Sequence, residues 1–91
     1  MAQVIITFKI MPESPEGDLN KIQEESDQLI KEFGGEVGKV EKSPVGFGLT
    51  ALVMIFVMDE SLGSTEELED KIKQLKDVAS VEVTDVRRAL G

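Results

Sequence analysis

The first apolar residues of the chain fall at every second position, which predicts a β-strand over residues 4–11. One set of side chains alternates with another along this stretch: Val4, Ile6, Phe8 and Ile10 with Ile5, Thr7, Lys9 and Met11. Period-two alternation and β-branched residues are typical of strands. Pro12 should end this strand, and the Pro and Gly residues within 13–17 predict a loop.

The spacing of apolar residues changes after Asp18 and predicts a helix. Helical spacing is followed by Leu19, Ile22, Ser26, Leu29, Ile30 and Phe33. Asp18 fits the N-cap position and Gly34-Gly35 fits a C-terminal stop. The helix is therefore expected to run from residue 19 to residue 33.

Two further strands are expected in the middle of the chain. Residues 36–42 form a weak, charged strand of the kind tolerated at a sheet edge. Residues 43–46, Ser-Pro-Val-Gly, predict a turn. Residues 49–58 are the core of the most apolar run and predict a long strand.

The last third of the chain predicts a helix and a fourth strand. Ser64-Thr65-Glu66-Glu67 matches a capping box, in which the Ser64 hydroxyl and the Glu67 carboxylate bind free backbone amides. The helix stripe that follows consists of Leu68, Ile72 and Leu75. Alternation returns over residues 78–86. The order of elements is β-α-β-β-α-β.

This order predicts an α+β fold, the ferredoxin-like sandwich, with a four-stranded antiparallel sheet and two helices on one face. The strands 4–11 and 49–58 should be central. Residues 49–58 carry apolar side chains on both faces, so some should remain on the open face. Two interpretations stand: a central strand sheltered by its neighbours, or an interaction surface, for example of a weak homodimer.

Composition narrows the class of protein. The chain has 91 residues, 41% of them hydrophobic and 31% charged, which fits one globular domain. A net charge of -8 argues against direct binding of nucleic acid and of anionic membranes. The chain has no cysteine, its start resembles no signal peptide, and its longest apolar run is too short to span a bilayer. A cytoplasmic location is expected.

The side chains that most enzymes need are absent. With no His and no Cys, the commonest general base and the commonest transition-metal ligands are missing. The carboxylate pairs Asp59-Glu60 and Glu66-Glu67 suit a solvated loop and a first helical turn. The loop after the first strand, Met-Pro-Glu-Ser-Pro-Glu-Gly-Asp over 11–18, is acidic and has prolines where a phosphate site needs amide donors. We therefore expect no enzyme activity, and no metal or cofactor bound by this chain.

Two short stretches remain as candidate partner-binding sites. The first is Pro44-Val45-Gly46-Phe47-Gly48, which places one of only four phenylalanines between two glycines. The glycines would allow either a tight bend over a core Phe47 or a displayed Phe47. The second is the end of the chain, where Asp85 precedes the adjacent Arg87 and Arg88. Arginines at a strand end are either solvated or part of a contact.

Together with the opening of the chain, these stretches resemble the archaeal elongation factor 1-beta family. The resemblance rests on three motifs in the same order: ITFKIMPESPEGDL over 6–19, PVGFGL over 44–49 and EVTDVRR over 82–88. It covers nearly the whole chain and implies that residues 1–91 form a single guanine-nucleotide-exchange domain. The implied partner is the elongation factor 1-alpha GTPase, which delivers aminoacyl-tRNA to the ribosome.

The resemblance also implies roles for the two stretches. In the eukaryotic relatives, the phenylalanine of the P-x-[GA]-F-G turn enters a pocket of the GTPase, and the matching residue here is Phe47. Those relatives also carry a lysine near the C-terminus that disturbs the Mg²⁺ site of the GTPase. This chain departs there, because the matching position is about Gly91 and only Arg87 or Arg88 could supply the cation.

The strand directions predict where the two candidate stretches lie. Since the strands 49–58 and 78–86 should run in the same direction, Phe47 and the arginines should lie at opposite ends of the sheet.

The alternative function is a small-molecule-binding regulatory domain that acts as a ferredoxin-like dimer. That alternative would use the apolar open face, but it leaves the Phe47 turn and the arginines without a role.

Overall fold

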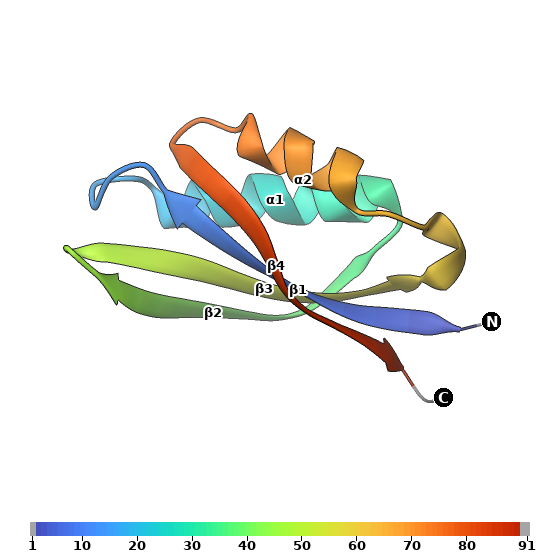
Figure 1. Ribbon diagram of the computed structural model, residues 1–91. Helices are drawn as coiled ribbons and strands as arrows, with labels where there is room; N and C mark the ends of the chain where they lie inside the picture. The colour runs from blue at the N-terminus through green and yellow to red at the C-terminus, as the bar shows by residue number, and fades with distance from the viewer. Residues whose placement is uncertain (1, 90–91) are drawn as a thin grey trace.

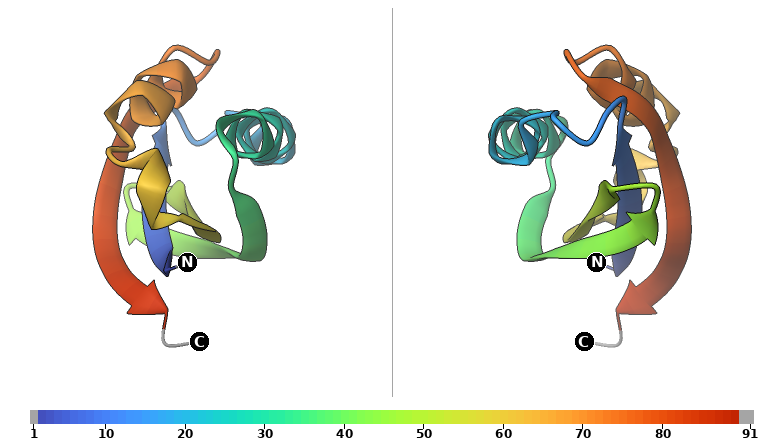
Figure 2. Two further views of the ribbon diagram at one scale, coloured as in Figure 1. Left: turned by 90° about the vertical axis from the view of Figure 1, so that its right-hand side faces the viewer. Right: turned by 90° about the vertical axis from the view of Figure 1, so that its left-hand side faces the viewer.

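The computed structural model describes residues 2–89 and has the predicted order of elements. The elements are β1 (Gln3–Pro12), α1 (Leu19–Phe33), β2 (Glu36–Gly46), β3 (Leu49–Asp59), the 3-10 turn η1 (Glu60–Leu62), α2 (Glu66–Lys73) and β4 (Val78–Ala89). The strands form one antiparallel sheet in the order β2-β3-β1-β4. Both helices lie on one face of this curved sheet (Figures 1 and 2). The ferredoxin-like α+β prediction is confirmed, with β1 and β3 central and β2 at an edge.

The ends of α1 are those that the sequence predicts. The Asp18 carboxylate accepts a hydrogen bond of 3.1 Å from the Lys21 backbone N–H. At the other end Gly34 has a φ of 110°, and its N–H donates to the carbonyls of Ile30 and Lys31. Only glycine adopts this left-handed conformation without strain, so the helix stops there.

The core lies between the helices and one face of the sheet. Its fully buried members come from β1, β3 and both helices: Phe8, Ile10, Ile30, Leu52, Met54, Phe56, Leu68 and Ile72. The rings of Phe8 and Phe56 meet edge to face with centroids 4.9 Å apart. This aromatic pair joins the two central strands at the middle of the core.

The predicted capping box of α2 is wrong. The N-cap is Thr65, whose hydroxyl donates to the Glu69 carboxylate at 2.7 Å and caps no backbone amide. The Ser64 hydroxyl accepts from the Glu66 N–H at 3.1 Å, so Ser64 forms a short turn before the helix. Glu67 lies 3.9 Å from Lys71, one helical turn on. The helix begins one residue later than the motif implies, which removes Glu67 from the position that a capping box requires.

The turn predicted over residues 43–46 is also misplaced. These residues belong to β2, and Gly46 pairs with Leu49, which leaves Phe47-Gly48 as a two-residue hairpin loop. The register shifts between Pro44 and Gly46. Such an irregularity tolerates a proline, which has no N–H to donate. Pro44 therefore sits in an edge strand and does not end it.

The open face of β3 fits the sheltered interpretation. Val53, Ile55 and Val57 are half-buried by their neighbours on β1 and β2, although no helix covers them. On β2 the ammonium of Lys39 lies 2.8 Å from the Glu41 carboxylate and borders this row of side chains. The structure shows one copy of the chain, and the homodimer stays a prediction.

Candidate functional site

Phe47 stands fully displayed at the tip of the β2–β3 hairpin. Its side chain is 100% exposed, whereas Phe8 and Phe56 are 0% exposed. A single exposed apolar side chain is normal on a protein surface, so the backbone conformation and the neighbours of Phe47 decide whether it points to a contact.

The backbone of the tip explains the flanking glycines. Gly46, Phe47 and Gly48 all have positive φ, at 103°, 52° and 76°. Two positive φ values in a two-residue loop match the twist of the flanking strands. A Cβ added at Gly46 would meet nothing within 4 Å, so this glycine serves the backbone conformation and not a close contact. The displayed interpretation of Phe47 is confirmed, and the core interpretation is wrong.

The backbone of Phe47 is strained in this turn, because its φ is positive. A bulky residue with positive φ is a genuine outlier, and such strain persists only where the surrounding structure holds it. Asn or Gly would adopt the same conformation with less strain. The presence of phenylalanine at this strained position therefore indicates that its ring contacts another molecule.

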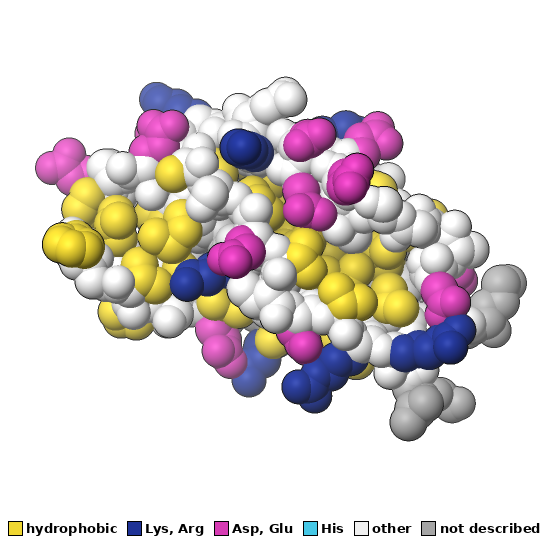
Figure 3. Space-filling model, in the orientation of Figure 1, with side chains coloured by type: hydrophobic (Ala, Val, Ile, Leu, Met, Phe, Trp, Pro, Cys, Tyr) yellow, Lys and Arg dark blue, Asp and Glu magenta, His cyan; other side chains and the backbone are white. Residues whose placement is uncertain are grey.

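Other apolar side chains gather near this tip. Val45 is exposed at the end of β2, and a Cβ at Gly48 would lie 3.6 Å from the ring of Pro15, in the loop after β1. Figure 3 shows hydrophobic side chains grouped at this end of the molecule. Phe47 therefore stands beside a small apolar surface.

The second candidate stretch lies on β4, which extends beyond its predicted end at residue 86 to Ala89. Arg87 pairs with Ile5 and Arg88 with Val4 on the neighbouring strand β1. Successive residues of a strand point to opposite faces, so the two guanidinium groups leave β4 on opposite sides.

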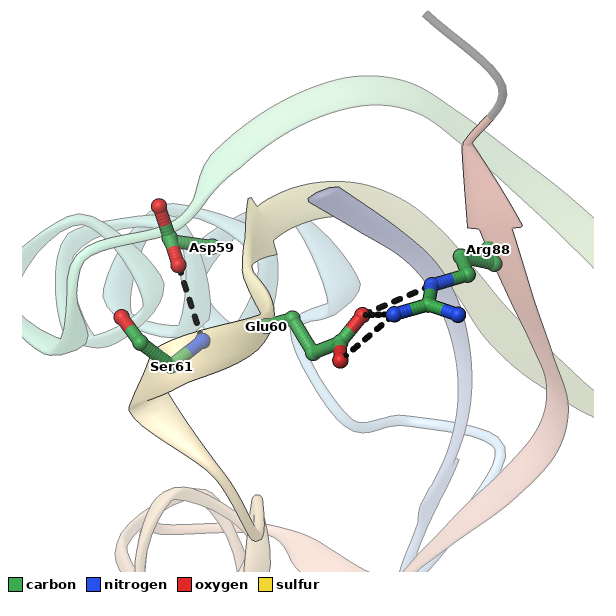
Figure 4. A network of polar contacts seen from close by, with 4 residues as sticks. All are labelled: Asp59, Glu60, Ser61 and Arg88. Carbon is green, nitrogen blue, oxygen red and sulfur yellow. Dashed lines mark hydrogen bonds and ion pairs between the residues drawn. The ribbon is translucent and has the colours of Figure 1, made fainter. Parts of the chain in front are cut away.

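The two arginines have different partners. The Nε atom of Arg87 lies 2.8 Å from the Asp85 carboxylate, two residues earlier on the same strand. Arg88 donates two hydrogen bonds of 2.8 Å to Glu60, from Nε to Oε2 and from Nη2 to Oε1 (Figure 4). Sequence reasoning assigned Asp59-Glu60 to a solvated loop and missed this pair, because the two residues are 28 positions apart.

The turn that carries Glu60 is held by its own hydrogen bonds. The Asp59 carboxylate accepts from the Ser61 backbone N–H at 2.8 Å (Figure 4). The Glu60 N–H donates to the Ala2 carbonyl, and the Gly63 N–H donates to the Glu60 carbonyl. The start of β1, the end of β3 and the end of β4 therefore meet in one corner.

The Asp59 bond predicts a pH dependence of stability. Hydrogen bonds from Ser61, the backbone N–H first, lower the pKa of the Asp59 carboxyl below its ordinary value of 3.8. A lowered folded-state pKa contributes stability that is present above pH 3.8 and lost as the pH falls through the folded-state pKa. Asp59→Asn should therefore lower the melting temperature at pH 7 and lower it less in acid. Thermal unfolding across pH 2.5 to 7 checks this, and a difference independent of pH would contradict it.

Phe47 and the arginines lie at opposite ends of the domain, as predicted. Phe47 precedes the start of β3, whereas Gln3 pairs with both Asp59 at the end of β3 and Ala89 at the end of β4. The longest dimension of the fold is 41 Å. A single partner that contacts both features must extend along the domain. Gly91, the position matched to the family lysine, lies outside the described residues.

Metal sites, membrane-spanning helices and open grooves are the other kinds of site that such a chain could carry. Within residues 2–89 no three acidic side chains are placed to hold a metal ion. None of the helices there is long and apolar enough to cross a membrane. An open groove of about 430 Å³ runs between α1 and β2, with Val37, Val40 and Met54 among its lining residues.

A family model and several individual relatives match this chain, and they point to the same family. Residues 5–89 match the family model described as the EF-1 guanine nucleotide exchange domain. The chain is 43% identical over 90 residues to elongation factor 1-beta of Methanobrevibacter smithii, and this alignment covers 99% of this chain and 100% of the relative. It is 40% identical over 90 residues, with the same coverage, to elongation factor 1-beta of Methanothermobacter thermautotrophicus. It is 40% identical over 82 residues to that of Nanoarchaeum equitans, with 90% and 100% covered.

Proposed function

The chain belongs to the EF-1 guanine nucleotide exchange domain family, and we propose that it contacts the elongation factor 1-alpha GTPase through both ends of its fold. Its function is to promote the exchange of GDP for GTP on that GTPase. We assign residues 1–91 to a single exchange domain that acts in the cytoplasm, where the GTPase delivers aminoacyl-tRNA to the ribosome.

Exchange requires a difference in affinity and no covalent chemistry. If the domain binds the nucleotide-free GTPase more tightly than the GDP-bound form, it weakens GDP binding by the same factor. No bond of the nucleotide is made or broken in this step. The proposal therefore needs no catalytic residue and no cofactor of this chain, and Mg²⁺ belongs to the nucleotide site of the GTPase.

The observation that carries the proposal is the fully exposed Phe47 on its strained hairpin. Aromatic side chains that enter a partner's pocket often dominate the binding energy of an interface. Pro44, Gly46 and Gly48 would act by holding the tip in shape, since Gly46 and Gly48 supply positive φ on either side. A tip already in its bound conformation loses little entropy on binding.

The other proposed contact is the corner formed by Asp85, Arg87 and Arg88. Arg87 and Arg88 are each paired with a carboxylate of this chain, so the corner carries no net positive charge. Arg87, whose partner lies on the same strand, is the cation that could turn to an acidic group or a phosphate held by the GTPase. The distance between this corner and Phe47 requires the GTPase to lie along the sheet. Contacts at two distant points would fix the orientation of the domain on its partner.

The experiment that tests the function is release of a fluorescent GDP analogue from elongation factor 1-alpha. Addition of this protein should accelerate release, and the acceleration should saturate with its concentration. Release at the spontaneous rate would contradict the proposal. The family match identifies exchange and so argues against the alternative of a small-molecule-binding regulatory dimer.

The double substitution Arg87→Ala with Arg88→Ala should lower exchange and leave folding almost unchanged. Both side chains are exposed, and substitutions at such positions usually change stability by about 0.5 kcal/mol or less. The variant loses the Arg87 cation and the pairing of Arg88 with Glu60, which should reduce stimulated GDP release about tenfold. Stopped-flow release and thermal unfolding measure the two effects.

A matched control is Lys71→Ala with Lys73→Ala, which removes the same charge from the last turn of α2. This control should exchange normally. Equal losses in both double variants would show that net charge matters, and the arginine corner does not.

A further inference from the structure

The ion pair between Glu60 and Arg88 links the turn η1 to the end of β4, two parts of the chain that are 28 positions apart. Both oxygens of the carboxylate accept from the guanidinium, each at 2.8 Å. Because the Arg88 and Glu60 side chains are 64% and 45% exposed, solvent screens the pair and its contribution to global stability is modest. A bidentate pair does fix the relative orientation of its two side chains. The ion pair therefore acts mainly by fixing the position of Arg88 relative to Glu60.

The end of β4 needs such a tie. β4 is an edge strand bonded only to β1, and the ends of edge strands fray unless another contact holds them. Val86 is 59% exposed, so apolar packing near this end is weak. After residue 85, the side-chain hydrogen bonds that leave β4 within the described residues are the two from Arg88 to Glu60.

Glu60 is well placed to serve as the fixed partner. Its backbone N–H donates to Ala2 at 3.0 Å, and its carbonyl accepts from Gly63 at 3.1 Å. The Asp59 carboxylate holds the first turn of η1 through Ser61. The carboxylate of Glu60 therefore projects from a turn that is held by hydrogen bonds (Figure 4).

Arg87 is the freer of the two cations. Its side chain is 76% exposed against 64% for Arg88, and its partner Asp85 belongs to the same strand. Arg88 has Nε and Nη2 occupied and its charge neutralised by Glu60. The two arginines of the corner are thus not equivalent.

We propose that Glu60 is a positioning residue for nucleotide exchange. It holds Arg88, and with it the end of β4, so that Arg87 on the other side of the strand is presented to the GTPase. In this inference, which rests on the proposed function, Arg88 acts through Glu60 and Arg87 acts on the partner.

A charge swap tests the proposal. Glu60→Gln and Arg88→Gln should each lower the maximal stimulated rate of GDP release about five- to tenfold, and the double Gln variant should be no worse, because the two side chains act as one unit. The swap Glu60→Arg with Arg88→Glu should recover the rate to within about threefold of wild type. If Arg88 itself contacts the GTPase, the swap places a carboxylate there and cannot recover.

Two readouts separate positioning from a loss of folding. The concentration of protein that gives half-maximal stimulation should change less than about twofold, since Phe47 still binds. A variant that is partly unfolded would instead change this concentration and keep the maximal rate. Amide hydrogen exchange at residues 86–89 should become faster in Glu60→Gln and return toward wild type in the swap.

The control variant is Asp27→Asn, which removes another exposed ion pair, the one between Asp27 and Lys31 on α1 at 3.2 Å. It should leave both readouts unchanged. Normal exchange in Glu60→Gln together with a loss in Arg88→Gln would overturn the proposal. If wild type does not accelerate GDP release, the proposed function falls and the exchange role of Glu60 with it. In that case amide exchange still decides whether Glu60 holds β4.

Discussion

Replacing Phe47 with alanine is expected to remove most of the nucleotide exchange activity and to leave the fold intact. The side chain is 100% exposed, so its loss creates no cavity. An aromatic anchor at an interface often contributes about 2 kcal/mol or more, which is roughly thirtyfold in affinity. Thermal unfolding and GDP release, measured on one preparation, check both parts. An unfolded variant, or one that exchanges normally, would contradict the prediction.

The variant Phe47→Asn sharpens this experiment. Asparagine tolerates the positive φ of 52° at this position, and Asn-Gly is a preferred sequence for a hairpin loop with two positive φ values. The variant should therefore be as stable as wild type or more stable, and as weak in exchange as Phe47→Ala. Stability that rises while activity falls would show that Phe47 is retained for its partner and not for the turn.

Phe56→Ala is expected to have the largest effect on stability. Phe56 is fully buried in β3 and its ring packs edge to face on Phe8. Truncation of a buried phenylalanine typically destabilises a domain by about 3–5 kcal/mol, from lost transfer energy and from the cavity that remains. Urea unfolding at 25 °C should show this as a lower midpoint with an unchanged slope.

Exchange by Phe56→Ala should fall only as far as the folded fraction falls. Addition of more protein should then recover the full stimulated rate, whereas for Phe47→Ala it should require about thirtyfold more. The same substitution at two phenylalanines thus separates a core residue from a contact residue. A Phe56→Ala domain with near-wild-type stability would contradict the assignment of the core.

The positions of elements could be predicted because their signals are local. Period-two alternation over residues 4–11 and helical spacing from Leu19 to Phe33 each reflect the face that is buried. The caps of α1 could be predicted as well, since Asp18 and Gly34 each satisfy backbone groups within four residues. The order of strands followed from the handedness of crossover connections.

Two local predictions failed where neighbouring strands or turns competed with a motif. Pro44 suggested a turn, but pairing of β2 with β3 continues to Gly46 because Pro44 lies on an edge strand that needs no donor there. The capping box failed because the 3-10 turn and Gly63 set where α2 begins. In the first case strand pairing outweighed the local turn preference, and in the second an adjacent turn outweighed a capping preference worth about 1 kcal/mol.

For this protein the sequence by itself determined the fold, the family and the two candidate stretches, because periodicity and motifs are properties of neighbouring residues. Only the tertiary structure decided that Phe47 is displayed, since exposure depends on what packs around a residue and no local pattern records it. It alone also brought Glu60 to Arg88, across 28 positions, through the antiparallel pairing of β1 with β3 and β4. Contacts of this kind are set by strand register. The hydrophobic pattern decides which face of each strand is buried, but it does not by itself decide which residues of neighbouring strands stand opposite each other.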